Sequence, residues 1–167
     1  QLQFADVAAS AGVANLGHTH IPFFADLDTD GWLDLILAHD TVTGGTHAPS
    51  AIYENQEDGT FADVTALSGF APLGHIKGGL GLTDYDRDGL LDIYVTTWKG
   101  GPSGTLLEGS NYLYRNLGGF VFEDTSVASG IGYQQVNAYT PVFSDFDNYC
   151  DSDLYQPIDG KPDYYFR

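Results

Sequence analysis

Two nine-residue stretches of the chain carry aspartates at the spacing of a site for a hard cation. Residues 26–34 and 84–92 each place carboxylates at positions 1, 3, 5 and 9 and a glycine at position 6. Calcium takes six to eight oxygen ligands, and alternate side chains of a tight loop converge on one point. Glycine at position 6 supplies the sharp turn, because it adopts a positive φ without steric cost. The sequence therefore predicts two calcium sites, with the side-chain ligands Asp26, Asp28, Asp30, Asp34, Asp84, Asp86, Asp88 and Asp92.

A third stretch, residues 145–153, repeats this pattern with two changes. Asp145, Asp147 and Asp153 keep positions 1, 3 and 9, whereas Tyr149 and Cys150 replace the acidic residue and the glycine. The loss of a ligand and of the glycine turn predicts weak binding or an empty site. A softer metal that binds the Cys150 thiolate is an alternative.

These loops differ from the EF-hand, which needs a glutamate at position 12 and flanking helices. Position 12 is Leu37 in the first copy and Val95 in the second, and short β-rich runs follow position 9. Each loop is therefore expected to close a β-hairpin, with its last aspartate at the start of the outgoing strand. The alternative for any one copy is an acidic turn without a metal. Two intact copies at the same spacing favour calcium.

The loops belong to a longer repeat of about 60 residues. A Phe-x-Asp segment recurs at Phe4, Phe61 and Phe122, at offsets of 57 and 61 residues, and each copy precedes a turn of small residues. An aromatic segment follows each loop, at 51–55, 112–116 and 164–167. The same features in the same order at one period indicate a tandem repeat.

Each repeat reads as four antiparallel strands. The first strand enters the loop and contains small residues, which suits a crowded innermost strand. The second leaves the loop, the third carries the aromatic segment, and the fourth carries Phe-x-Asp. The expected ranges are 21–25, 33–38, 51–55 and the Phe61 segment, then 79–83, 91–96, 112–116 and the Phe122 segment, then 140–144, 154–157 and 164–167.

Four such strands per repeat predict an all-β fold of β-propeller blades. The acidic loops and the wording Asp-Gly-Thr-Phe-x-Asp-Val-Thr resemble the FG-GAP/VCBS repeats of integrin-α-type propellers, and particularly bacterial secreted proteins of the ASPIC/UnbV type. The resemblance implies Ca²⁺ in each loop between the first and second strands. It also implies that position 7 contributes its backbone carbonyl, which adds Trp32, Leu90 and, in the altered third loop, Asp151 to the expected ligands.

The repeat divides the chain into one partial strand and three blades. Residues 1–17 form the fourth strand of a preceding or shared blade, 18–75 and 76–135 form blades, and 136–167 form an incomplete blade. Known propeller rings contain about four blades or more. Two expectations therefore stay open. The chain is part of a longer propeller, or copies associate when the fourth strand of one completes the last blade of another.

Composition limits the partners and the compartment. The net charge of −17 argues against nucleic acid, which needs a basic surface, and no apolar run reaches the ~20 residues of a membrane span. One cysteine permits no internal disulfide. The chain contains no methionine, even at residue 1, so a processed or excerpted product is expected. Acidic calcium sites suit the millimolar calcium outside cells, which favours a secreted or cell-surface protein.

No catalytic constellation can be identified, so the first hypothesis is a non-enzymatic role in structure, adhesion or assembly, with a protein partner. The alternative is a propeller portion of a secreted enzyme acting on polysaccharide, or a glycan-binding lectin.

His18 and His20 would bind a transition metal if they pair on one strand face, although local packing is the simpler role. Trp98 is expected to pack or to stack on a sugar ring. The loops 41–50 and 99–110 offer a variable recognition surface.

Overall fold

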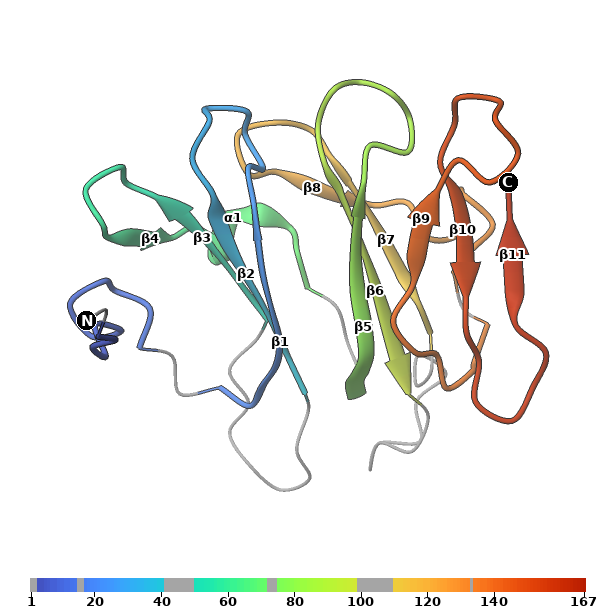
Figure 1. Cartoon of the computed structure of the whole chain (residues 1–167), viewed down its shortest axis with the longest axis horizontal. Coiled ribbons are helices and arrows are strands. Elements are labelled where there is room, and N and C mark those ends of the chain that lie inside the picture. The colour runs from blue at the N-terminus through green and yellow to red at the C-terminus, as the bar shows by residue number, and fades with distance from the viewer. Residues whose placement is uncertain (1–2, 15–16, 41–49, 72–74, 99–109, 133) are drawn as a thin grey trace.

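The protein consists almost entirely of β-strands. A computed structural model describes residues 3–14, 17–40, 50–71, 75–98, 110–132 and 134–167. Among these residues, eleven strands form three antiparallel sheets, and α1 (Thr65–Ser68) is a single helical turn. The sheets stand side by side in chain order and do not close into a ring (Figure 1). This arrangement confirms the predicted all-β fold of propeller-like blades.

The sheets follow one plan, in which strands that are neighbours in sequence are also neighbours in the sheet. The first two sheets have four strands and the third has three. The first contains β1 (Thr19–Ala25), β2 (Asp34–His39), β3 (Ala51–Asn55) and β4 (Phe61–Asp63). The second contains β5 (His75–Thr83), β6 (Asp92–Trp98), β7 (Tyr112–Asn116) and β8 (Phe122–Asp124). The third contains β9 (Val142–Ser144), β10 (Asp153–Gln156) and β11 (Tyr164–Phe166).

Each acidic loop joins the first two strands of its sheet. The pairs that flank the loops are Ala25 with Asp34, Thr83 with Asp92, and Ser144 with Asp153. The last aspartate of every loop is therefore the first residue of the outgoing strand, as the sequence predicted.

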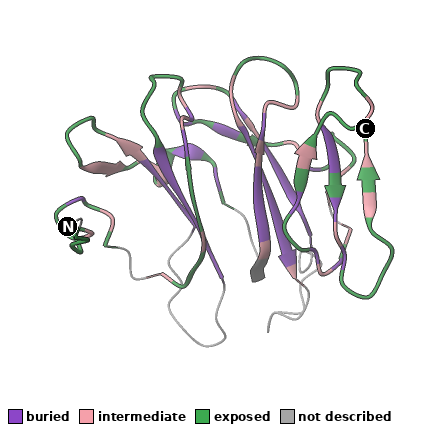
Figure 2. Ribbon diagram, viewed as in Figure 1, coloured by how far each residue is buried: buried purple, intermediate pink, exposed green. Residues whose placement is uncertain are grey.

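The second strand of the first sheet is buried along its whole length, because its two faces contact different clusters (Figure 2). Ile36 and Ala38 belong to a cluster shared with residues of the second sheet, including Ile93. Leu35 and Leu37 point the other way, into a cluster that includes Val13 of the N-terminal segment. The alternation follows from the two-residue period of a strand. It explains why β2 reads as a continuous apolar run.

The innermost strand of the second sheet is crowded, and glycine makes its packing possible. A Cβ on Gly79 would lie 2.4 Å from Thr140 Cα, and one on Gly78 would lie 2.1 Å from the carbonyl oxygen of Ala138. Only glycine permits such an approach of neighbouring backbones. The expectation that small residues mark the crowded innermost strand is confirmed here.

The turn after one fourth strand packs on the fourth strand of the next sheet. Gly69 follows α1 with a φ of +72°, and a Cβ there would lie 2.5 Å from the carbonyl oxygen of Phe122. The next residue, Phe70, is buried and packs edge-on against Tyr114, with ring centroids 5.0 Å apart. The turn and the aromatic residue after it thus join consecutive sheets.

Residues 3–14 differ from the expected N-terminal strand. They form turns without a strand, and Phe4 is fully exposed. The sequence likeness to β4 and β8 predicted a strand, but residues 3–14 form no strand pairing among the described residues, and a strand needs a partner for its backbone hydrogen bonds. The segment contacts the first sheet through Ala11, whose carbonyl accepts the Phe61 N–H at 2.9 Å.

Candidate metal centres

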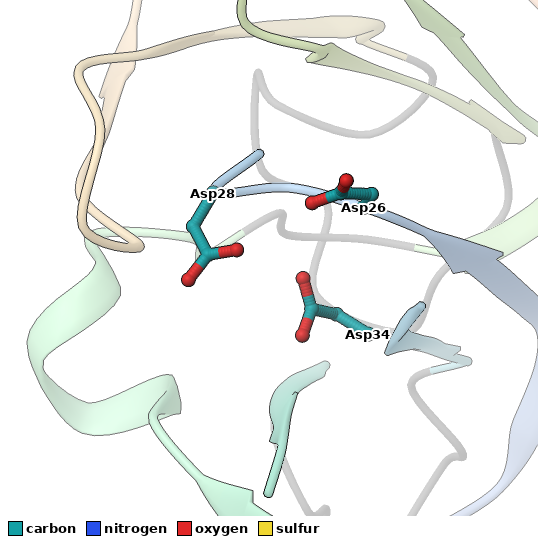
Figure 3. A group of neighbouring side chains, drawn as sticks. All are labelled: Asp26, Asp28 and Asp34. Carbon is teal, nitrogen blue, oxygen red and sulfur yellow. The ribbon is translucent and has the colours of Figure 1, made fainter. Parts of the chain in front are cut away.

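The first acidic loop brings three carboxylates together between β1 and β2. Asp26, Asp28 and Asp34 each offer an oxygen, and these oxygens lie within 4.8 Å of one another. Figure 3 shows the three side chains directed toward a common point. Asp26 and Asp28 come from the loop itself, whereas Asp34 is the first residue of β2. A single cation at that point would contact all three.

The backbone of the loop is wound around the Asp26 side chain. Asp26 Oδ1 accepts the N–H of Asp30 at 3.1 Å, and Oδ2 accepts the N–H of Gly31 at 2.9 Å. The winding needs positive φ at Thr29 (66°) and Gly31 (93°). The Asp30 carboxylate accepts the N–H of Trp32 at 2.7 Å and does not belong to the 4.8 Å group.

Asp34 is held from two directions and is almost completely buried. Its Oδ2 accepts the N–H of Leu27 in the loop at 2.9 Å, and its Oδ1 accepts the N–H of Asn55 at the end of β3 at 3.0 Å. Burial raises the pKa of Asp34, and the nearby carboxylates of Asp28 and Asp30 raise it further. A charge that is unfavourable in this place calls for a neighbouring positive charge.

The second loop, between β5 and β6, has the same construction. Its group comprises Asp84, Asp86 and Asp92, again within 4.8 Å. Asp84 accepts the N–H groups of Asp88 and Gly89, at 3.0 and 2.9 Å. Asp92 accepts those of Tyr85 at 2.9 Å and Asn116 at 2.8 Å, and burial raises its pKa to about 6.

The third loop keeps this backbone although its sequence has changed. Asp145, Asp147 and Asp153 form the third group within 4.8 Å. Cys150 adopts a φ of 64° at the glycine position, and its N–H still reaches Asp145 Oδ2 at 2.9 Å. A side chain thus occupies a left-handed position, which strains the backbone. The three carboxylates nevertheless converge as they do in the intact loops.

Several predicted ligands lie outside the three groups. Asp88 faces Arg115, whose Nη2 donates to Asp88 Oδ2 at 3.2 Å. Asp151, expected to contribute its backbone carbonyl, pairs through its side chain with Arg87 of the second loop, Nη2 to Oδ2, at 3.3 Å. The contacts of Trp32 and Leu90 are through their N–H groups, to Asp30 and Asp88. The proposal that residues at position 7 ligate through their carbonyls stays a prediction.

Sequence reasoning missed the polar residues that end the third strands. Asn116 donates its side-chain Nδ2 to the carbonyl of Leu91 in its own loop at 3.1 Å and to that of Leu27 in the first loop at 2.8 Å. Asn55 makes only the first kind of contact, to Leu33 at 2.9 Å. Arg115 lies beside Asn116 and contacts the second group. The recurrence of asparagine as the last residue of the segments 51–55 and 112–116 was the sequence signal for these contacts.

The other candidates take other roles or lie outside the description. His18 and His20 are exposed, and His20 Nε2 lies 3.7 Å from Asp40 Oδ2. Trp98 packs edge-on against Tyr139 and donates its indole N–H to the carbonyl of Ala138 at 2.8 Å, so packing explains it. Residues 41–49 and 99–109, which hold nearly all of the expected recognition loops, lie outside the described residues.

The donor set fits a hard cation. Each group consists of carboxylate oxygens only, with one buried aspartate and two on a tight loop, which are the ligands that calcium prefers. When bound, calcium would supply positive charge where three negative charges converge. Asp26, Asp28 and Asp34 would hold it in the first loop, and their counterparts would hold it in the other two. The loop would then be fixed to β2, and through Asn55 to β3.

Comparison with known proteins agrees with the repeat. Residues 26–95 match the FG-GAP-like repeat family, whose repeats often bind Ca²⁺ and occur in extracellular proteins. Cartilage acidic protein 1 of Mus musculus is 31% identical over 103 residues, 59% of this chain and 14% of that protein. Its Xenopus tropicalis counterpart is 32% identical over 63 residues, 38% of this chain and 10% of that protein. The chain therefore spans about a tenth to a seventh of these relatives.

A solved structure shares the fold. It is that of an Agrocybe aegerita lectin that recognises non-reducing terminal N-acetylglucosamine. The TM-score is 0.52 at 23% identity, over 90% of this chain and 35% of the lectin chain. Among the described residues, no helix is long and apolar enough to span a membrane.

Proposed function

We propose that this chain is a calcium-binding segment of an extracellular β-propeller, with a structural role in adhesion or assembly. The observation that carries the proposal is the recurrence of one geometry. Three separate loops each bring a position-1, a position-3 and a position-9 aspartate within 4.8 Å. An acidic turn without a ligand has no reason to preserve that convergence three times, including once where the glycine has been replaced.

Calcium would stabilise the fold by joining parts that otherwise repel each other. Each group holds three carboxylates, and the chain as a whole carries a net charge of −17. A ligand that binds only the folded state stabilises it by mass action. We propose binding at the first two loops, with weaker binding at the third, where an acidic residue and the glycine are missing.

The test is calorimetric titration of the full chain with CaCl₂, followed by thermal unfolding with calcium or with a chelator. Calcium should raise the melting temperature, and Asp34→Ala should reduce both the heat of binding and that rise. Asp159→Asn is the matched control, because Asp159 is an exposed aspartate outside the loops. Equal melting temperatures with calcium and with chelator would remove calcium from the proposal.

The extracellular location and the bacterial ASPIC/UnbV-type relationship are parts of the same proposal. Occurrence of FG-GAP repeats in extracellular proteins supports the location, and acidic sites of this kind suit millimolar calcium. The Asp-Gly-Thr-Phe-x-Asp segment at residues 58–63 supports the relationship. Secretion of the full-length protein from its native cell, followed by detection in the medium, tests the location.

We further propose that the outer face of the third sheet is covered by another blade, from additional sequence or from a second copy. Four large side chains on this face are substantially exposed: Val142, Phe146, Tyr155 and Tyr165. Such a patch marks an interaction site in soluble proteins. The native mass with calcium and with chelator tests the second copy, since a monomer under both conditions leaves only additional sequence.

Glycan binding is the second candidate function. It is favoured by the shared fold of a lectin that recognises N-acetylglucosamine, although a fold does not fix a ligand. A glycan array probed with the calcium-loaded chain tests it. Binding without turnover would favour a lectin, whereas release of sugar would favour an enzyme and contradict the non-enzymatic proposal.

A further inference from the structure

One position in each repeat faces the acidic group, and its charge is negative in the first sheet and positive in the other two. It lies directly after the aromatic residue that pairs with the second strand: Tyr53 with Leu35, Tyr114 with Ile93, and Phe166 with Leu154. The next residue is Glu54 in the first sheet, Arg115 in the second and Arg167 in the third. We name this the facing position.

In the second sheet, the facing position brings a guanidinium onto the carboxylates. Arg115 Nε lies 2.5 Å from Asp86 Oδ2, and Nη2 lies 3.2 Å from Asp88 Oδ2. Asp86 belongs to the converging group, so the arginine neutralises one of the carboxylates that a cation would use. Arg115 is thus a tethered cation at the edge of the second site.

The third sheet repeats this contact in a looser form. Arg167 Nη1 lies 3.6 Å from Asp147 Oδ2, and its guanidinium also stacks over the Tyr165 ring, 5.5 Å from the centroid. The arginine is more exposed than Arg115 and reaches a single carboxylate of the group. It competes for Asp147 less effectively than Arg115 competes for Asp86.

In the first sheet, the same position adds a negative charge instead. Glu54 lines one hollow together with Asp28, so its carboxylate lies beside a member of the first group. No arginine or lysine among the described residues forms an ion pair with Asp26, Asp28 or Asp34. At the facing position, the first site therefore has an additional carboxylate, whereas the second has a guanidinium that competes with a cation for Asp86.

We infer that the facing position grades the divalent-cation affinity of the three loops. Glu54 strengthens the first site, whereas Arg115 must leave Asp86 before the second site can fill. The inference rests on the proposed calcium binding. Because a tethered guanidinium and a divalent cation repel each other, removal of Arg115 should raise the second site's affinity by ~3–10-fold.

The sites can be read separately by amide NMR of the full chain. Gly31 N–H contacts Asp26 and Gly89 N–H contacts Asp84, so each amide reports on one loop during a CaCl₂ titration. In the unaltered chain, Gly31 should respond at lower calcium than Gly89. Arg115→Gln should move the Gly89 midpoint to lower calcium by ~3–10-fold and leave the Gly31 midpoint within about 2-fold.

Arg87→Gln is the matched control, because it removes the same charge from the second loop itself. The Arg87 guanidinium pairs with Asp151 rather than with the second group. It should move the Gly89 midpoint less than Arg115→Gln does. In the reciprocal arm, Glu54→Arg should shift the Gly31 midpoint to higher calcium by ~10-fold. The Gly160 amide, in the turn between β10 and β11 and outside the three loops, monitors the fold.

The outcomes separate this inference from the proposal beneath it. Suppose that the Gly31 and Gly89 amides respond to calcium. If Arg115→Gln then moves the Gly89 midpoint no further than Arg87→Gln does, and Glu54→Arg does not move the Gly31 midpoint, the facing position does not grade affinity. If no amide of the loops responds to calcium at all, calcium binding itself is wrong, and the inference is overturned with it.

Discussion

Asp92→Asn separates the structural and the metal-binding roles of the second buried aspartate. Asp92 is inaccessible to solvent, and burial raises its pKa to about 6 from the ordinary value of 3.8. The ionised form at neutral pH therefore destabilises the calcium-free fold by about 2–3 kcal/mol. Asparagine removes that charge but directs an amide N–H₂ at Tyr85 N–H or Asn116 N–H, which costs about 1–3 kcal/mol. The two effects nearly cancel, so with chelator the variant should unfold within a few degrees of the unaltered chain.

Calcium should separate the melting temperatures of Asp92→Asn and the unaltered chain. At ~10–100 times the dissociation constant, one bound ion adds about 1.4–2.7 kcal/mol to the stability of the folded state. Asp92→Asn loses a charged ligand of the second site, so it should not gain this increment. For a chain of this length, the difference in melting temperature in calcium should be roughly 3–10 °C.

The assay is thermal unfolding followed by circular dichroism, at about 10 mM CaCl₂ and with chelator. Asp92→Ala is the companion variant. It leaves the N–H groups of Tyr85 and Asn116 without an acceptor, which outweighs the removal of the charge, so it should lose up to about 3 kcal/mol, most of it already with chelator. An Asp92→Asn chain whose response to calcium equals that of the unaltered chain would refute the assignment of Asp92 as a ligand.

Three further outcomes are expected. Asn116→Ala should lower stability by about 2–3 kcal/mol in urea unfolding, because two loop carbonyls lose their donor, whereas Asn55→Ala should cost about half as much. Gly79→Ala should destabilise by at least about 1–3 kcal/mol in the same assay, since its Cβ would overlap Thr140. With chelator, the stability contributed by Asp92 is present below about pH 4 and lost as the pH rises through about 6, because its folded-state pKa is raised. Melting temperatures at about pH 4 and 7 should thus diverge more for the unaltered chain than for Asp92→Asn, and parallel curves would contradict the pKa argument.

Much of the fold could be predicted because the three copies of the repeat can be aligned with one another. The loops indicated where the first strand of each sheet ends and the second begins, and the observed starts of β2, β6 and β10 fall on the ninth loop residue. The N-terminal segment could not be predicted in the same way. Its Phe-x-Asp sequence matches β4, but strand formation depends on a partner that local sequence does not encode.

The sequence predicted the converging aspartates of the candidate sites but not the side chains that contact them. Spacing alone identified the aspartates at positions 1, 3 and 9, because alternate loop residues and the first strand residue must converge. It did not show that Asp88 turns toward Arg115, or that Asp151 pairs with Arg87. Those contacts join segments distant in sequence, and side-chain placement across a sheet or between sheets is set by tertiary packing.

Hydrogen bonds connect the first loop to the second sheet, so a cation bound in one loop would also affect the other. Leu27 lies between Asp26 and Asp28; its N–H donates to Asp34 and its carbonyl accepts from Asn116 of the second sheet. Asn116 in turn donates its own N–H to Asp92. A cation that fixes Asp34 therefore fixes the carbonyl to which the second loop is tied, and one that fixes Asp92 acts in the reverse direction. Coupling of this kind is reciprocal, so filling either loop should favour filling the other. Such ties would let calcium stabilise the contact between neighbouring sheets as well as each sheet.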